Sequence, residues 1–148
     1  MPTTIRPATA GDVPILSAME AATFSEPWSE AAVAAHLAGE HHFAAVALTE
    51  AGEVAGYLFG LVLSGEAELL RVAVLPAHRH RGIGFHLVDA FLLHLAGQDV
   101  RTCFLEVRES NSAAIGLYEE HGFTAVGRRK AYYRKPTEDA IVMRYERK

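Results

Sequence analysis

Cysteine and long apolar runs are the two features that this sequence most lacks. Cys103 is the only cysteine among 148 residues, so no disulfide can form within the chain. The longest apolar stretch, residues 54–63, contains ten residues with two glycines, whereas a helix that spans a bilayer needs roughly 20 residues. The first residues also lack the apolar segment of a signal peptide. We therefore expect a cytoplasmic protein that makes no contact with membranes.

Basic residues are scarce in the first half of the chain. Residues 1–70 contain one base, Arg6, against nine acids, a net charge of −8. Residues 71–148 contain thirteen bases against nine acids, a net charge of +4. The total of −4 argues against direct nucleic-acid binding, which favours a strongly basic surface. The asymmetry leaves two explanations open: chance in a small protein, or two partners of opposite charge.

The remaining composition is that of an ordinary globular domain. Half of the residues are hydrophobic and 22% are charged. A chain of this length builds one core, so residues 1–148 are predicted to form a single domain. Eight histidines raise the question of a metal, but the sequence has no HExxH motif, and His86 and His94 lie two helical turns apart. We expect no metal site.

Apolar periodicity, helix caps and chain breakers predict a mixed α/β fold, α+β-like, with helices on the faces of one sheet. Thr9 and Asp12 form a capping box, and Ser29 and Asn111 are N-cap candidates. Gly122 is expected to stop the last helix in a left-handed conformation. The predicted helices cover residues 13–23, 29–37, 82–96 and 112–121, and the predicted strands cover residues 3–7, 42–49, 53–63, 68–75, 101–108, 124–133 and 139–145.

A basic, glycine-bearing loop lies between the fourth predicted strand and the helix that follows. A helix N-terminus offers free backbone N–H groups and a partial positive charge, and glycine lets that backbone approach a ligand closely. The loop has no Lys-Ser/Thr ending, which excludes a Walker A motif, and Leu87 stands where a Rossmann fingerprint needs its third glycine. What remains is an RxxGxG loop that suits a pyrophosphate, or a helix that follows a solvated basic turn. It consists of Arg79, His80, Arg81, Gly82, Ile83 and Gly84.

One carboxylate and one phenol are candidates for acid–base catalysis. Glu106 shares a strand face with Phe104, and we expect partial desolvation there to raise its pKa and make it a better base. The alternative is a structural glutamate at the strand end, paired with an arginine such as Arg108. Tyr118 lies on the predicted buried side of a helix, where its phenol is either a proton donor or a core group with a satisfied hydroxyl.

Three further features have simpler interpretations. Cys103 has no neighbouring His or Lys, so an inert core thiol is expected. Glu68 is a second candidate base, ranked below Glu106. The run Arg128–Lys130 is interpreted as a solvated face, with phosphate contact as the alternative.

Several separated motifs give the chain a family resemblance. The RxxGxG loop after the strand Leu70–Val74 is similar to the acyl-CoA pyrophosphate loop of the GNAT N-acetyltransferases. The segment Leu105–Phe123 resembles the signature of the RimI-type ribosomal-protein-alanine N-acetyltransferases, and Pro27-Trp28-Ser29 resembles their substrate loop. Tyr132-Tyr133 with Glu138-Asp139-Ala140 and Met143 is similar to their C-terminal hairpin. Two departures are Leu75, where an acid is usual, and Gly116, which either permits close packing or is tolerated.

The resemblance implies a fold and a cosubstrate. The fold is a mixed, mostly antiparallel sheet of about seven strands with about four helices, and the fourth and fifth strands splay apart. The cosubstrate is acetyl-CoA, whose pyrophosphate would be held by the backbone amides of residues 81–84 and whose pantetheine arm would pair with the strand at 72–74. The cofactor-binding residues implied are Val72, Ala73, Val74, Arg79, His80, Arg81, Gly82, Ile83, Gly84, Asn111 and Tyr118.

The resemblance also implies a reaction. Glu106 would act as general base through water and Tyr118 as general acid, in a direct transfer without an acyl-enzyme. Trp28, Tyr132 and Tyr133 would contact the acceptor, most simply the N-terminal alanine of a small-subunit ribosomal protein, whose basic segment suits the acidic half of the chain. A lysine side chain, a small-molecule amine, or a silent acyl-CoA sensor are the alternatives. We expect a monomer or a weak dimer.

Overall fold

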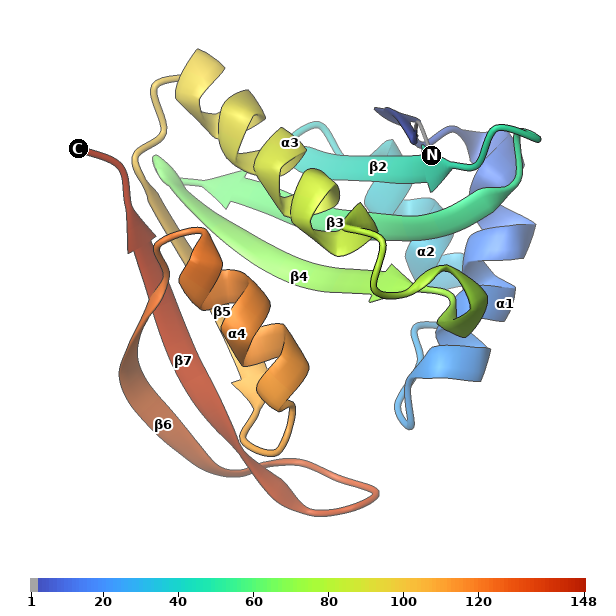
Figure 1. The fold of residues 1–148 in the computed structure, drawn as a ribbon. Coiled ribbons are helices and arrows are strands. Elements are labelled where there is room, and N and C mark those ends of the chain that lie inside the picture. The colour runs from blue at the N-terminus through green and yellow to red at the C-terminus, as the bar shows by residue number, and fades with distance from the viewer. Residues whose placement is uncertain (1–2) are drawn as a thin grey trace.

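The computed structural model describes residues 3–148 and shows one seven-stranded sheet with helices on both faces (Figure 1). The strand order is β1-β2-β3-β4-β5-β7-β6. Every predicted helix and strand is present, with its ends within two residues of the expected ones. The strands are β1 Thr4–Pro7, β2 His42–Leu48, β3 Val54–Leu63, β4 Glu66–Val74, β5 Thr102–Arg108, β6 Thr124–Tyr133 and β7 Glu138–Glu146. The helices are α1 Val13–Thr23, α2 Glu30–Ala38, α3 Ile83–Gly97 and α4 Ser112–Glu120, and 3-10 turns cover Ala10–Asp12 and Pro76–His78.

The three predicted helix caps are confirmed. The carboxylate of Asp12 accepts the Thr9 backbone N–H at 2.7 Å and also receives the Arg6 guanidinium at 2.8 and 2.9 Å. The hydroxyl of Ser29 accepts from the third residue of the helix that it caps, at 3.0 Å, and the amide oxygen of Asn111 does the same at 3.1 Å. Each cap satisfies a backbone donor that the first helical turn leaves free.

Two hydrophobic cores lie on opposite sides of the sheet. Helices α3 and α4 cover one face and α1 and α2 cover the other (Figure 1). In the first core, Leu87 and Phe91 of α3 pack on the sheet. A Cβ atom at Gly60 would lie 2.5 Å from Phe91 Cζ, so the absence of a side chain on β3 allows this close approach. In the second core, Leu16 and Val33 join α1 and α2 to β3.

The middle of the sheet opens between β4 and β5, as the resemblance implied. β5 runs parallel to β4 only over Glu66–Leu69, and beyond Leu69 the two strands diverge (Figure 1). The break coincides with a β-bulge in β4, because Phe59 pairs with Arg71 while the next residue of β3 pairs with Leu69. Leu70 is the extra residue. The end of β4 therefore has backbone groups that β5 does not pair.

The bulge also exchanges the faces that β4 presents. Ala67 and Leu69 pack in the core under α3 and α4, whereas Ala73 packs in the core under α1 and α2. A shift of one residue moves every following side chain to the other face of a strand. The opening between β4 and β5 is thus built into the sequence of β4 itself.

Candidate active site

Four segments surround the opening between β4 and β5. The start of α3 follows the end of β4, and the start of α4 follows the end of β5. The connection between α1 and α2 and the hairpin between β6 and β7 lie at the same end of the molecule (Figure 1). Helix α4 covers one face of β5. The α1–α2 connection and the β6–β7 hairpin lie toward the opposite face. The opening is therefore bordered by different segments on the two sides of the sheet.

The basic loop turns sharply into α3. His80 and Gly82 have positive φ values of 64° and 79°, and Gly82 caps the helix. A Cβ atom at Gly84 would lie 3.3 Å from Leu117 Cδ2, so this glycine allows α4 to pack close to the loop. The N–H groups of the first turn of α3 have no partner within the helix, and such groups bind phosphate oxygens well. This geometry fits a pyrophosphate.

The two arginines of the loop do not act alike. The Arg79 side chain donates from Nε to the carbonyl of Val74 at 3.0 Å and so ties the loop to the end of β4. The Arg81 side chain lies in a surface groove with Ile5 and Asp89, on the side of α3 that faces β1. Arg79 is thus tied to β4, whereas Arg81 lines the groove beside β1.

Glu106 lies on β5 with its side chain 18% exposed. It pairs with Arg129, which reaches it from β6 across β7. Glu106 is thus paired with an arginine, as the structural alternative expected, but the partner is Arg129 and not Arg108, which pairs with Glu138 at 3.2 Å. Sequence reasoning missed Arg129, since its run of three bases was interpreted as a solvated face.

Glu68 lies on the same face of the sheet as Glu106. It stands beside Phe104 in the parallel register, and Glu106 is two residues farther along β5. Burial, followed by the negative charge of Glu106, raises the pKa of Glu68, while Arg129 opposes the shift. The two carboxylates and one guanidinium form a charged cluster at the point where the strands begin to separate.

Tyr118 is buried on α4, on the other side of β5 from this cluster. Burial raises the pKa of its phenol, and the nearby groups Tyr133 and Cys103 raise it further. The phenol is therefore protonated at neutral pH and can only donate a proton. Burial also raises the pKa of Cys103 to about 12, as expected for an unreactive core thiol.

Two adjacent tyrosines of the hairpin border the charged cluster. Tyr132 is half exposed, and its ring lies 5.1 Å from that of Tyr133. The guanidinium of Arg108 lies 4.6 Å from the centre of the Tyr133 ring. Burial, followed by the charge of Glu106, raises the pKa of Tyr133 to about 12. Both phenols are neutral hydrogen-bonding groups on the side of the sheet that bears the carboxylates.

Trp28 anchors the connection between α1 and α2. Its ring stacks on Phe59 at 5.1 Å and lies 5.4 Å from His36. Its backbone N–H donates to Glu20 at 2.8 Å. Glu20 is fully buried and also receives the Tyr57 hydroxyl. Sequence reasoning missed Glu20, although an acid among the apolar positions of α1 is a signal of such a role.

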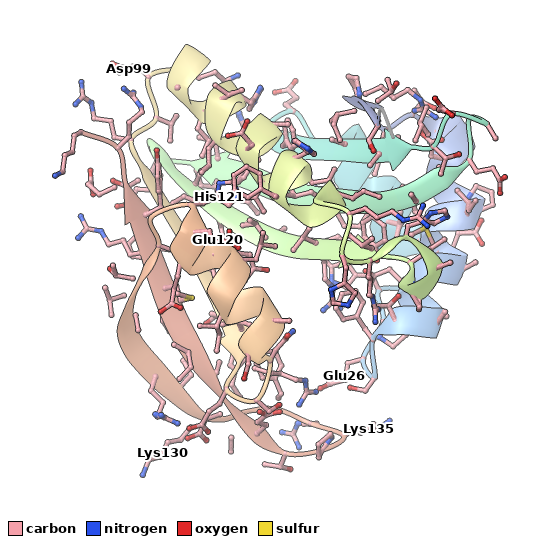
Figure 2. The ribbon with its side chains drawn as sticks, viewed as in Figure 1. Glu26, Asp99, Glu120, His121, Lys130 and Lys135 are labelled. Carbon is pink, nitrogen blue, oxygen red and sulfur yellow. The ribbon has the colours of Figure 1, made fainter. Side chains whose placement is uncertain are left out.

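Arg108 joins the two segments that border the carboxylate side. It donates to the carbonyls of Arg134 and Pro136 at 2.8 and 3.0 Å, and to the Ser25 hydroxyl at 3.2 Å. The Arg134 backbone N–H in turn donates to Glu26 at 2.8 Å. Figure 2 shows Glu26 and the hairpin tip at the same end of the molecule. The hairpin and the α1–α2 connection are thus held together beside β5.

Two other observations concern residues 3–148. No group of three potential ligands there could hold a metal ion. No helix in that range is long and apolar enough to cross a membrane.

Gly116 on α4 has open space where its Cβ atom would lie, so the suggestion that it permits close packing is wrong.

Comparisons with known proteins agree with this geometry. Residues 13–123 match the model of the acetyltransferase (GNAT) family. The chain is 38% identical over 136 residues to the ribosomal protein bS18-alanine N-acetyltransferase of Escherichia coli, with 89% of each chain covered. It is 37% identical to N-alpha-acetyltransferase RimI of Mycobacterium tuberculosis, with 97% of this chain and 92% of the relative covered.

Solved structures show the same architecture. The crystal structure of the ribosomal-protein-S18-alanine N-acetyltransferase from Escherichia coli has a TM-score of 0.91 at 33% identity, covering 98% of this chain and 94% of the other. Arabidopsis thaliana NAA60 in complex with acetyl-CoA has the same fold, with a TM-score of 0.90 at 18% identity and 98% of each chain covered. The chain is an acetyltransferase that belongs to the GNAT family and, within it, resembles the RimI-type alanine N-acetyltransferases of ribosomal proteins.

Proposed function

We propose that this enzyme transfers the acetyl group of acetyl-CoA to the α-amino group of an N-terminal alanine, in a small-subunit ribosomal protein. The observation that carries the proposal is the position of two groups on opposite sides of β5. Tyr118 lies on the α4 side, and Glu106 lies on the face toward the hairpin and the α1–α2 connection. An acid for the leaving group and a base for the attacking amine need this separation.

Acetyl-CoA would occupy the side of α3 and α4. Val72, Ala73 and Val74 pair with β3 on one edge of β4, and their other edge, which β5 leaves free, can pair with the amides of a pantetheine arm. The left-handed Gly82 and the first turn of α3 can receive the pyrophosphate. Asn111 begins α4 next to this path. NAA60 of Arabidopsis thaliana, which has the same fold, has been crystallised with acetyl-CoA.

The acceptor would enter from the carboxylate side as an ammonium. An α-amino group has a pKa of about 7.7–8.0 and lysine one of about 10.4, so the α-amine loses its proton more easily near neutral pH. Glu106 takes that proton through water, and the neutral amine attacks the thioester carbonyl. A C–N bond forms while the C–S bond breaks, and Tyr118 gives its proton to the departing sulfur. The nitrogen loses its second proton as the amide forms, and this proton restores the Tyr118 phenol through water.

The relatives and the charge distribution support the acceptor class. The Escherichia coli relative is named for the alanine of ribosomal protein bS18. The acidic half of this chain supplies α1, α2 and the connection that contains Trp28, whereas the basic half supplies the phosphate loop. An acidic surface beside Trp28 would suit a basic protein N-terminus, and the basic phosphate loop would suit a polyanionic cosubstrate.

The proposal is tested by offering acetyl-CoA and a panel of peptides. The panel contains a peptide with a free N-terminal alanine, the same peptide with a blocked N-terminus and an internal lysine, and a small amine. We expect release of the CoA thiol only with the first peptide. Release with the lysine peptide or the small amine alone would point to one of those acceptors instead, and tight CoA binding without release would indicate a sensor.

A further inference from the structure

Arg129 reaches a predicted catalytic carboxylate from the far edge of the sheet. In the register, Arg129 stands opposite Ala140 of β7, and Ala140 stands opposite Arg108 of β5. The small side chain of Ala140 leaves room for Arg129 to lie over β7 and pair with Glu106, which is two residues from Arg108. In Figure 2 the next residue, Lys130, instead extends away from the protein.

The pairing places one cation against two carboxylates. Glu68 and Glu106 share a face, and each negative charge penalises the other. Arg108, on the same face two residues from Glu106, is already paired with Glu138 at 3.2 Å. Tyr132 and Tyr133, which border the cluster, are neutral phenols whose pKa values are raised. Without Arg129, this part of the site would be a pair of acids that attracts a cation.

The ion pair between Arg129 and Glu106 is exposed to solvent at its arginine end. The Arg129 side chain is 59% exposed and is carried by β6, an edge strand. Its guanidinium also lies 5.8 Å from the centre of the Tyr132 ring. Arg128 is held differently, because it pairs with both Glu109 at 2.8 Å and Asp139 at 3.0 Å. Because the arginine end of the pair is exposed, solvent and salt weaken its attraction, and another cation can compete with it for the carboxylate.

We infer that Arg129 occupies the subsite for the acceptor ammonium, formed by Glu68 and Glu106, and that the incoming N-terminus displaces it. The inference rests on the proposed function, in which Glu106 receives the acceptor proton. A guanidinium stays charged at any working pH, so it can fill the subsite but cannot be acetylated in place of the amine. Arg129 thereby keeps other cations from the base until an acceptor with enough further contacts arrives.

Displacement has a kinetic signature. Because the acceptor competes with Arg129, its apparent affinity is reduced by the fraction of enzyme in which Arg129 fills the subsite. The substitution Arg129→Gln removes the competitor, and we expect the KM for the alanine peptide to fall about three- to tenfold at saturating acetyl-CoA. The kcat value should change less than the KM. Glu68→Gln should raise the KM, because the subsite loses one of its charges.

The experiment compares wild type, Arg129→Gln and the matched control Arg128→Gln. Each variant must first show the same thermal midpoint and the same Kd for CoA as the wild type. Methylguanidinium is then added as a probe of the vacated subsite, and it should compete with the peptide in Arg129→Gln at lower concentrations than in wild type or in Arg128→Gln.

Three results would overturn the inference while leaving the proposed function in place. The first is a KM and a kcat that are both unchanged in Arg129→Gln. The second is a loss of kcat at constant KM, which would show that Arg129 supports Glu106. The third is methylguanidinium inhibition that is equal in all three proteins. A wild-type enzyme that acetylates no N-terminal alanine would refute the proposed function and the subsite together.

Discussion

Glu20 and Trp28 are joined by a hydrogen bond in which the buried carboxylate accepts the Trp28 backbone N–H at 2.8 Å. The same carboxylate receives the Tyr57 hydroxyl, and Arg71 Nε lies 3.4 Å from it. Arg71 also lies over the Phe24 ring, 4.1 Å from its centre. One buried acid at the end of α1 thus fixes the connection that we expect the acceptor to contact.

Removing this acid should destabilise the protein strongly. In Glu20→Ala, the Trp28 N–H, the Tyr57 hydroxyl and the Arg71 guanidinium lose a buried partner. Breaking a buried charged network from one side costs about 3–5 kcal/mol. Urea denaturation of this variant measures the loss, with Glu40→Ala, an exposed acid, as the control expected to stay within about 0.5 kcal/mol. A loss as small as that of the control would show that Glu20 is not the anchor.

Tyr118→Phe should slow turnover without weakening cofactor binding. The substitution removes only the hydroxyl, so the core contacts of the ring remain. Loss of a general acid lowers the rate by about 10² to 10⁴. Thiol release measures the turnover, and titration with CoA measures the Kd, which we expect to be unchanged. A turnover equal to that of wild type would remove Tyr118 from the mechanism.

Glu106→Gln should lower the rate most where the acceptor is protonated. A glutamine cannot accept the proton, but an amine that is already neutral needs no base. The residual rate should therefore rise with pH up to about pH 8, the range in which an α-amino group loses its proton. The control is Glu109→Gln, an exposed acid paired with Arg128. If the deficit of Glu106→Gln were the same at every pH, the base would be another group, and Glu68 would be tested next.

Asp12 makes the stability of the fold depend on pH in the acid range. The Arg6 guanidinium, which hydrogen-bonds to the Asp12 carboxylate, holds its pKa at about 2, below the ordinary 3.8. Because the folded pKa is the lower one, the contribution is complete above about pH 4 and is lost as the pH falls toward 2. Its size is about 1–2 kcal/mol.

The variant Asp12→Asn tests that contribution. It should be less stable than wild type at pH 7 by about 1–2 kcal/mol, and the difference should vanish near pH 2. Urea denaturation at several pH values measures both. A difference that persists unchanged at pH 2 would mean that the Arg6–Asp12 pair has no electrostatic role.

Local patterns in the sequence were sufficient to predict the elements of the fold. The caps at Ser29 and Asn111 and the stop at Gly122, whose φ is 96°, set helix ends that the structure reproduces. These signals are local because each depends on a few neighbouring residues and on backbone geometry. The opening between β4 and β5 came from the family resemblance and not from residue patterns.

The partners of the charged residues could not be predicted in the same way. β7 lies between β5 and β6, so the chain order alone does not show that Arg129 faces Glu106 or that Arg108 faces Glu138. The bulge at Leu70 is likewise invisible in an apolar strand, although it decides which side chains face the cores. These features depend on strand order and register, which are tertiary properties.

The most direct test of N-terminal acetylation by this enzyme is the position of the acetyl group on a single peptide. The peptide carries a free N-terminal alanine and one internal lysine, and it is incubated with the enzyme and acetyl-CoA at pH 7 before fragmentation in a mass spectrometer. We predict one acetyl group, on the α-amine of the alanine. Acetylation of the lysine, or no acetylation of a peptide that a known N-terminal acetyltransferase modifies, would contradict the account.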